Sequence, residues 1–188
     1  MSNILHIRPR RLHNGGMSTL HEIGNAVRAR RTEMGLTQET LAQVSGLSRS
    51  TINAVEKQSI GNLSISKAEA LLESIGLSMK VATSGMARAP SPKKAPPSRS
   101  ALERAASTAS VSYQPVMSAR QLEAALLTGI APRPVRPHLQ VLLDEAPMSL
   151  LAKVVDELHA DKGVERSHVW SQMRRLAHEL QCFRTVWQ

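Results

Sequence analysis

Apolar residues recur at helical spacing along most of the chain, and polar capping residues and glycines divide them into short segments. In the first half, each apolar run follows a residue whose side-chain oxygen can accept from a free N–H group at a helix start, so four helices are predicted. Their expected caps are Thr19, Thr37, Ser48 and Ser64, and their expected stops include Gly35, Gly46 and Gly76. The residues expected to face the core are Leu20, Ile23, Val27, Met34, Leu41, Ala42, Val44, Leu47, Ile52, Val55, Ile65, Ala68, Leu71, Leu72 and Ile75.

The text "LSMKVAT" after the fourth predicted helix alternates apolar and polar residues. Leu77, Met79 and Val81 recur with the period of two that is typical of a strand with one buried face. Because a lone strand is not stable, we expect it to pair with the same strand of a second subunit. The pattern therefore predicts a homodimer.

The composition changes between residues 84 and 112, where Pro, Ala, Ser and Lys dominate. Four of the ten prolines stand at positions 90, 92, 96 and 97. A segment of this kind buries little apolar surface, so it is expected to be a flexible linker, with at most a transient helical turn over 101–106.

Residues 113–188 return to helical spacing and predict a second small helical unit. Ser118 with Gln121 has capping-box spacing, and further helices are expected to begin at Pro137, Ser149 and Ser167. The text "APRPVRP" between the first two is expected to be extended, because each proline disfavours helix for the residue before it. A packed stripe is expected along the last helix, formed by Val169, Met173, Leu176, Leu180, Phe183 and Trp187.

Charge is unevenly distributed over these segments. The formal net charge is +9, and residues 1–85 hold 10 Lys or Arg against 6 Asp or Glu. Residues 86–112 hold 5 against 1, whereas the remainder holds 9 against 8. An excess of positive charge confined to the N-terminal unit and the linker favours a polyanionic partner, of which nucleic acid is the commonest in a cell.

Other features restrict the class of protein. The single Cys182 cannot form an internal disulfide, and no apolar run is long enough to span a membrane, so a cytoplasmic protein associated with the nucleoid is expected. No nucleotide-binding fingerprint is present, and no histidine pair has helical ligand spacing. We therefore expect no enzyme activity, no cofactor and no metal. Residues 1–17 are expected to be a flexible leader, in which Arg8, Arg10 and Arg11 are either a minor-groove arm or a leader without function, and Met17 is an alternative start.

The stretch "TQETLAQVSGLSRSTINAVEKQ" predicts two short helices joined by a tight turn that contains glycine, which is the helix-turn-helix arrangement. Ala42 and Gly46 are small, so we expect them to let the two helices cross closely. The second helix would then present short or hydrogen-bonding side chains to a major groove about 12 Å wide. That outer face has no acidic residue of its own before Glu56.

The text "RRTEMGLTQETLAQVSGLSRSTINAVEK" resembles the Cro/CI–XRE helix-turn-helix family of bacterial and phage repressors, over about Leu20 to Ile75. The resemblance implies a lambda-repressor-like DNA-binding domain over 18–83. It also implies roles for single residues, which we state as expectations. Ser48, Arg49, Ser50 and Asn53 would face base edges; Gln38 and Lys57 would contact phosphates; and Arg31 with Glu56 would form a structural ion pair.

Two departures from the family pattern guide the functional interpretation. Gln58 stands where the family often has glycine after the recognition helix, and "GLSMKV" replaces the usual fifth helix. Both features are similar to HipB-like antitoxins. We therefore expect a mainly α protein that binds a near-palindromic operator as a homodimer and represses its own operon, with residues 113–188 binding a cognate toxin. The aromatic residues of that unit could form the toxin interface or could be core, and the alternative is a phage or mobile-element repressor whose C-terminal domain oligomerises or senses a ligand.

Overall fold

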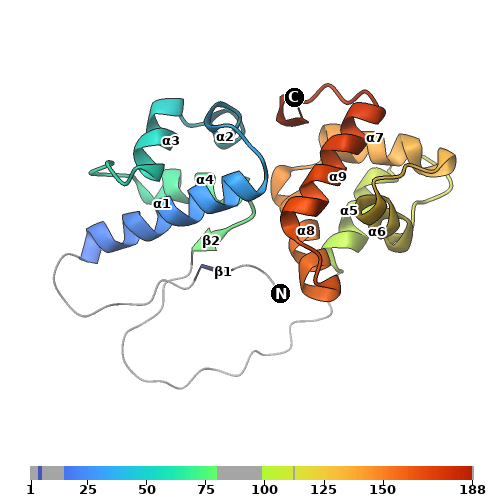
Figure 1. The fold of residues 1–188 in the computed structure, drawn as a ribbon, viewed down its shortest axis with the longest axis horizontal. Helices are drawn as coiled ribbons and strands as arrows, with labels where there is room; N and C mark the ends of the chain where they lie inside the picture. The colour runs from blue at the N-terminus through green and yellow to red at the C-terminus, as the bar shows by residue number, and fades with distance from the viewer. Residues whose placement is uncertain (1–3, 6–14, 80–98, 112, 188) are drawn as a thin grey trace, which may run out of the picture.

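A computed structural model describes residues 4–5, 15–79, 99–111 and 113–187, and it is mainly helical, as predicted (Figure 1). The N-terminal unit contains strand β1 (Ile4–Leu5), helices α1 (Gly15–Glu33), α2 (Gln38–Ser45), α3 (Arg49–Glu56) and α4 (Ile65–Ser74), and strand β2 (Ser78–Met79). The C-terminal unit contains α5 (Ala101–Ala109), α6 (Ala119–Thr128), the 3₁₀ turn η1 (Arg133–Val135), α7 (Arg136–Glu145), α8 (Met148–Lys162), α9 (Arg166–Glu179) and a second 3₁₀ turn, η2 (Thr185–Trp187).

Local capping signals determine where α2, α3 and α4 begin. The side chains of Thr37, Ser48 and Ser64 each accept a hydrogen bond from the backbone N–H three residues later, so these three predictions are confirmed. Thr19 is not a cap, because α1 already begins at Gly15. Ile65 was expected in the core but is 71% exposed, since it is the first residue of α4 and precedes the buried face.

Gly24, rather than Gly46, is the glycine that lets two helices of this unit approach closely. A Cβ atom on Gly24 would collide with the carbonyl oxygen of Val55, so α1 and α3 can pack at this distance only because residue 24 has no side chain. Gly46 has open space around it, and its role is different from the one expected. It ends α2 in the left-handed conformation, with φ of 70°.

Strand β2 pairs with β1 of the same chain. The two strands are parallel, with Ile4 opposite Ser78 and Leu5 opposite Met79. The expected partner was the same strand of a second subunit, so the pairing differs from the prediction. The backbone groups of this edge of β2 are already engaged within the chain, which weakens the argument for a dimer built on this strand.

The end of the expected linker is a helix. Ala101–Ala109 form α5, whose start carries a capping box between Ser100 and Glu103. The carboxylate of Glu157 on α8 also accepts hydrogen bonds from the N–H groups of Ala101 (2.6 Å) and Leu102 (3.2 Å). This alanine-rich helix packs against α6, α7 and α8, because its small buried side chains let these helices approach. The remaining linker residues, 84–98, lie outside the described residues.

The other C-terminal helices begin within about one residue of the predicted positions. The Ser118–Gln121 capping box is confirmed as a start signal, and α6 and α8 end at Gly129 and Gly163, both in the left-handed conformation. Residues 133–137 were expected to be extended but form η1 and the first turn of α7. There proline occupies an early helical position, where its missing N–H costs nothing.

The apolar stripe of the last helix stops earlier than predicted, because α9 ends at Glu179. Val169, Met173 and Leu176 are fully buried on α9. Trp187 reaches the core from η2, with its ring centroid 6.5 Å from that of Trp170. Phe183 was assigned to the stripe but is 81% exposed.

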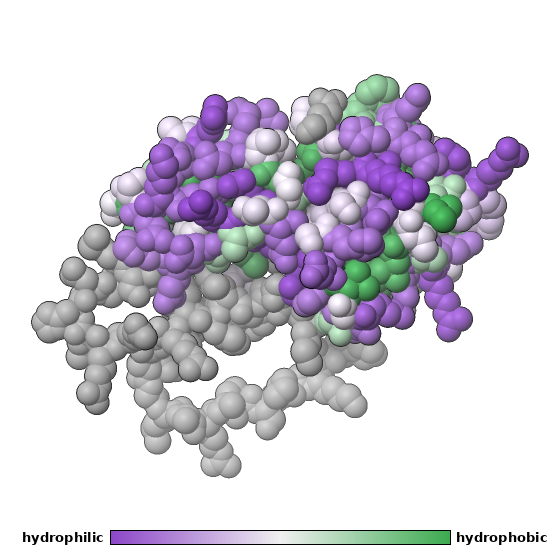
Figure 2. All heavy atoms as spheres, in the orientation of Figure 1, coloured by the Kyte–Doolittle hydropathy of each residue, from purple (hydrophilic) through white to green (hydrophobic). Residues whose placement is uncertain are grey.

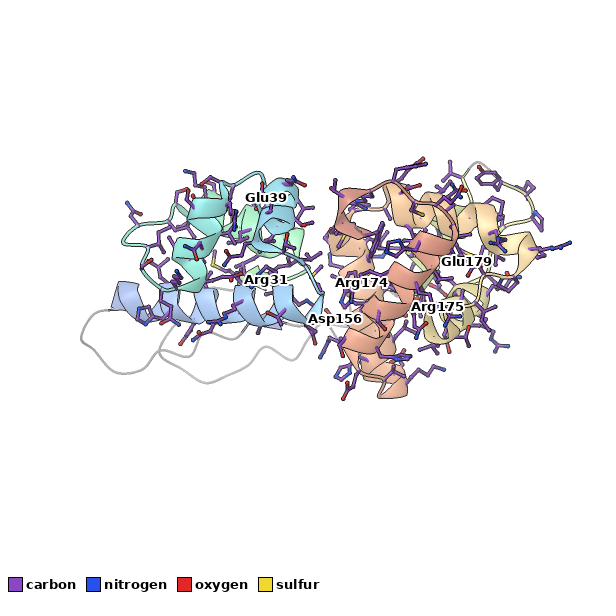
Figure 3. The ribbon with its side chains drawn as sticks, turned by 45° about the horizontal axis from the view of Figure 1, so that its top comes forward. Arg31, Glu39, Asp156, Arg174, Arg175 and Glu179 are labelled. Carbon is purple, nitrogen blue, oxygen red and sulfur yellow. The ribbon has the colours of Figure 1, made fainter. Side chains whose placement is uncertain are left out.

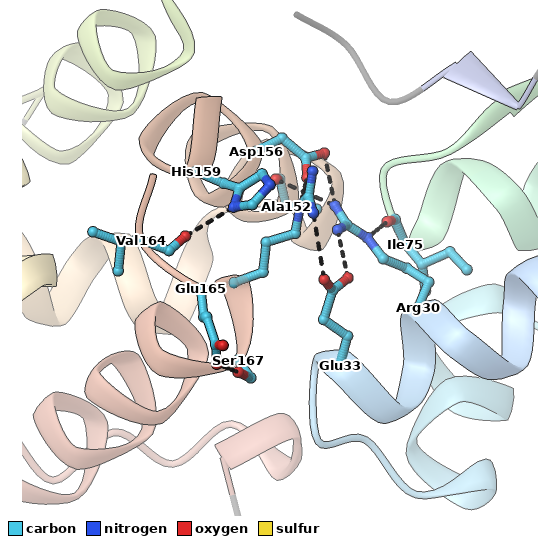
Figure 4. Close-up of polar contacts among 10 residues, drawn as sticks. Arg30, Glu33, Ile75, Ala152, Asp156, His159, Val164, Glu165 and Ser167 are labelled. Atoms are coloured by element: carbon cyan, nitrogen blue, oxygen red, sulfur yellow. Dashed lines mark hydrogen bonds and ion pairs between the residues drawn. The ribbon is translucent and has the colours of Figure 1, made fainter. Parts of the chain in front are cut away.

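The two helical units are in contact, through α1 with α9 and α4 with α8. A cluster of charges links the two surfaces (Figure 4). Arg30 is 3% exposed, and its guanidinium donates to Asp156 Oδ2 (2.7 Å), to Glu33 Oε2 (2.9 Å) and to the carbonyl oxygen of Ile75 (3.2 Å). Asp156 is 4% exposed and also accepts from Arg166 Nε (2.7 Å). Because a buried charge is costly without a partner, loss of either Arg30 or Asp156 is expected to weaken the contact between the two units.

Two further contacts join the units. Arg174 on α9 donates to the carbonyl oxygen of Met34, just after the end of α1 (2.7 Å), where a positive charge is favoured by the helix dipole (Figure 3). Gly76 after α4 lies so close to Ala152 on α8 that an added Cβ would be 2.6 Å from the Cβ of Ala152. The expectation of two modules separated by a linker therefore omitted a direct contact between them.

Candidate nucleic-acid interface

Helices α2 and α3 form a compact helix-turn-helix. The turn between them contains Gly46 and Ser48, and the N–H of Leu47 donates to the carbonyl oxygen of Ala42 (3.1 Å), which closes the end of α2. On α3, Ile52 and Val55 are buried, so this face fixes the helix against the core. The opposite face and the first turn of α3 remain open to solvent.

A group of hydroxyls surrounds the start of α3. Ser48 Oγ lies 2.8 Å from the hydroxyl oxygens of both Ser50 and Thr51, and it accepts from the Thr51 N–H (3.2 Å). Ser48 and Ser50 are exposed, as the prediction of base contacts requires. However, Ser48 is committed to capping, so Ser50 has the freer hydroxyl.

Arg49 is the long cationic side chain at this end of α3. Its side chain is 70% exposed, and its Nε lies 3.9 Å from Glu39 Oε2. Asn53 lies one helical turn further along the same face and is partly exposed. Lys57, the C-cap residue of α3, is exposed. These three side chains could therefore contact a duplex that covers the open face of α3.

Glu39 is a residue that the sequence analysis missed. It lies in the first turn of α2 (Figure 3), and its side chain is 59% exposed. It belongs to a different helix from Arg49, whose side chain it approaches. The spacing of residues along α3 could not identify Glu39, because Glu39 belongs to α2. An exposed ion pair of this kind contributes about 0–1 kcal/mol, so it restrains Arg49 only weakly.

Arg31, Gln38 and Glu56 form one hydrogen-bonded group beneath α3. Arg31 donates to both carboxylate oxygens of Glu56, from Nε (2.6 Å) and Nη2 (2.9 Å), and also to the carbonyl oxygen of Leu36 (2.7 Å). Gln38 Nε2 donates to Glu56 Oε2 (2.9 Å). This fixes the amide of Gln38 and leaves its second N–H for a phosphate at the start of α2.

The same group sets the protonation of Glu56. Burial raises the pKa of the Glu56 carboxyl, but hydrogen bonds from Arg31 and Gln38 and the positive charge of Arg31 and Arg28 outweigh burial. The net effect is a pKa below the usual 4.5, so Glu56 is ionised at neutral pH and the ion pair is intact.

Gln58 occupies the position where the family often has glycine. Its φ is 59°, the left-handed conformation that glycine adopts easily and that costs other residues roughly 1–2 kcal/mol. Its side chain donates to Asn25 Oδ1 (2.7 Å), which ties the end of α3 to α1. The backbone therefore keeps the turn that a glycine would give, although the sequence lacks the glycine.

The comparison with protein families supports this geometry. Residues 27–81 match the family model described as helix-turn-helix, which covers α2, α3, α4 and the second part of α1. The match agrees with the predicted likeness to the Cro/CI–XRE type. No curated protein and no solved structure matches the chain. The N-terminal unit is a helix-turn-helix domain, and this supports a role for the chain as a DNA-binding transcriptional regulator.

Among the described residues, no helix is both long and apolar enough to cross a membrane, and no group of three or more His, Cys, Asp or Glu is placed to hold a metal ion. The basic residues Arg8, Arg10 and Arg11, considered as a minor-groove arm, lie outside the described residues.

Proposed function

We propose that the protein is a sequence-specific DNA-binding autorepressor that places the first turn of α3 in a major groove. The observation that carries this proposal is the open first turn of α3, where exposed Arg49 and Ser50 stand on a rigid helix. A guanidinium there can donate to O6 and N7 of one guanine, which discriminates by about 1–3 kcal/mol against the wrong base. Ser48 and Asn53 would contribute further base contacts.

Phosphate contacts would hold this helix in register. The second N–H of the Gln38 amide, the free backbone N–H groups at the start of α2, and the exposed Lys57 amine flank α3. We propose that a homodimer binds a near-palindromic operator with half-sites about 34–36 Å apart, on the cytoplasmic chromosome. Such binding should weaken by roughly 10³ or more between 50 and 200 mM salt.

Two single substitutions test the division between base and phosphate contacts. Arg49→Ala should reduce the preference for one base pair in each half-site by about 5- to 150-fold, the equivalent of 1–3 kcal/mol. Lys57→Ala should weaken binding to all sequences about equally and lower the salt dependence. Competition titrations with operators substituted one base pair at a time measure both effects, and thermal melting checks that each variant is folded.

The opposite pattern would contradict these assignments. If Arg49→Ala weakens all duplexes equally, Arg49 contacts phosphate rather than a base. A third variant, Glu39→Gln, removes a carboxylate beside Arg49 and should raise affinity severalfold at low salt. Unchanged affinity in Glu39→Gln would place α2 and its carboxylate away from the duplex.

A second candidate function is that of an antitoxin of the HipB-like branch, with residues 113–188 binding a toxin. Two arguments for it have lost force, because β2 pairs within the chain and Trp170 and Trp187 are core residues. One observation still favours a protein partner. An almost entirely apolar groove of about 240 Å³ lies between α6 and η1, beside Ile130, which is 59% exposed.

The antitoxin hypothesis predicts that the chain copurifies with the product of an adjacent gene, and that deleting this chain alone arrests growth. Replacing Ile130 with Ser should then weaken the complex without changing DNA affinity. If the chain copurifies with no neighbour and its deletion is harmless, the alternative is a phage or mobile-element repressor whose C-terminal unit oligomerises or senses a ligand.

A further inference from the structure

One end of a cleft on the C-terminal unit gathers three positively charged side chains, Arg99, Arg104 and Lys153, none of which belongs to α2 or α3. Two adjoining cavities of about 720 and 370 Å³ share the side chains of Arg99, Arg104, Ser149 and Lys153. The larger one extends to Leu77 and Ser78, at the end of the N-terminal unit. Among the described residues, none from α2 or α3 lines either cavity, and in Figure 1 α3 and β2 lie at opposite sides of the N-terminal unit.

The smaller cavity is basic throughout its described lining. Arg99, Arg104 and Lys153 are joined there by three hydroxyl side chains and Leu150, and no carboxylate is among the described residues that line it. The hydroxyls belong to Ser107, Thr108 and Ser149. Guanidinium, ammonium and hydroxyl groups are the side chains that bind phosphate oxygens.

These cations lack a carboxylate partner within the described part of the chain, although eight ion-pair contacts form elsewhere in it. Three like charges gathered at one cavity repel one another, so an anion that binds among them is stabilised.

The larger cavity has a mixed lining. Four carboxylates, those of Glu73, Asp156, Glu157 and Asp161, lie in it together with Ser78 and Ser100. The Glu157 carboxylate is already held by the backbone of α5, through Ala101 N and Leu102 N. Such a lining suits the hydroxyl or amino groups of an uncharged polar body rather than a second anion. Each of the two volumes lies within the range of pockets that bind small organic ligands, about 300–1,000 Å³.

We propose that this cleft binds a phosphorylated small molecule of about nucleotide size, with its phosphate among Arg99, Arg104 and Lys153 and its polar body in the larger cavity. Lys153 stands on α8 three residues before Asp156, which pairs with Arg30 of the N-terminal unit. Figure 4 shows Ala152 and Asp156 of α8 beside Arg30 of α1, so the phosphate lies about one helical turn from this contact between the units.

The test measures, by calorimetry, the binding of pyrophosphate and of ATP to the full chain in the absence of DNA. Both probes should bind saturably, and the double variant Arg104→Ala/Lys153→Ala should bind each at least ten times more weakly. Both side chains are exposed, so the variant should melt as the wild type does. Arg133→Ala is the matched control, because it removes an exposed cation from η1 and should bind the probes normally.

Three results would overturn the proposal. The first is no saturable binding of either probe below millimolar concentration, and the second is equal loss of binding in the Arg133→Ala control. The third is that a nonspecific duplex displaces pyrophosphate and that the double variant loses affinity for the duplex. This result would show that the cleft binds the phosphates of DNA rather than those of a small molecule. None of these outcomes depends on α3, so failure here is distinguishable from failure of the proposed base contacts.

Discussion

Replacing Asp156 with Asn tests the buried link between the two units. The substitution keeps the shape of the side chain and removes its charge, which leaves the Arg30 guanidinium buried opposite a neutral amide. Breaking one partner of a buried ion pair costs about 3–5 kcal/mol. Glu33 remains 2.9 Å from Arg30 and its side chain is 29% exposed, so it compensates part of the lost charge. We therefore expect Asp156→Asn to lower the free energy of unfolding by about 3 kcal/mol, the lower end of that range.

Urea unfolding followed by two signals measures this loss. Tryptophan fluorescence reports the C-terminal unit alone, because Trp170 and Trp187 both lie there, whereas far-ultraviolet circular dichroism reports both units. The two transitions should coincide in the wild type and separate in Asp156→Asn, since the units are then coupled less strongly. Asp161→Asn removes an exposed carboxylate from the same helix and should change stability by less than about 0.5 kcal/mol.

Equal stability of the two variants would refute this reasoning. It would mean that the Arg30–Asp156 contact contributes nothing to the arrangement of the units. Transitions that stay superimposed in Asp156→Asn would likewise show that the coupling between units does not depend on this pair.

Three further predictions follow from single sites. Gly24→Ala should lower the unfolding free energy by about 1–3 kcal/mol, because its Cβ would collide with backbone, whereas Gly61→Ala, with open space around it, should be nearly neutral in the same urea titration. Glu56 has a lowered pKa in the folded state, so its contribution to stability is present above pH 4.5 and is lost as the pH falls through the folded-state pKa. Glu56→Gln should therefore lose less stability than the wild type over that pH range, as measured by thermal melting at each pH. An equal dependence of melting temperature on pH in the two proteins would contradict this. The pKa of the Cys182 thiol is raised from 9.0 to about 11, first by burial and then by the charge of the Asp144 carboxylate and a hydrogen bond with it. Alkylation of Cys182 at pH 8 should therefore be about 100-fold slower in the native protein than in urea. Comparable alkylation rates would contradict the burial of this thiol.

Features set by neighbouring residues were predictable from the sequence. Ser48 caps α3 and Gly46 ends α2 through contacts within a few positions, so the spacing alone located the helix-turn-helix. The start of α1 was misplaced, since Thr19 has capping spacing but the helix continues back to Gly15. Phe183 was misplaced for a related reason: the apolar spacing continues beyond Glu179, although the helix does not.

Features set by distant residues were not predictable. Helix α5 looked like linker because its alanines carry little apolar surface, and what completes its start is Glu157, more than 50 positions away. The Arg30–Asp156 pair joins residues 126 positions apart, and no local pattern marks either one. On the surface proposed to bind DNA, the spacing predicted Arg49 as a base contact but did not point to Glu39, because the proximity of the two side chains depends on how α2 and α3 cross.

Selection of duplexes from a random library by the purified full chain tests the central claim most directly. If α3 reads a major groove in each half of a dimer, the selected duplexes should share two dyad-related boxes with centres about 10–10.5 base pairs apart, or a multiple of that spacing. The Arg49→Ala protein should select the same boxes, but one position in each box should no longer show a preferred base. Enrichment without any shared box, by a chain that still binds DNA, would contradict the account.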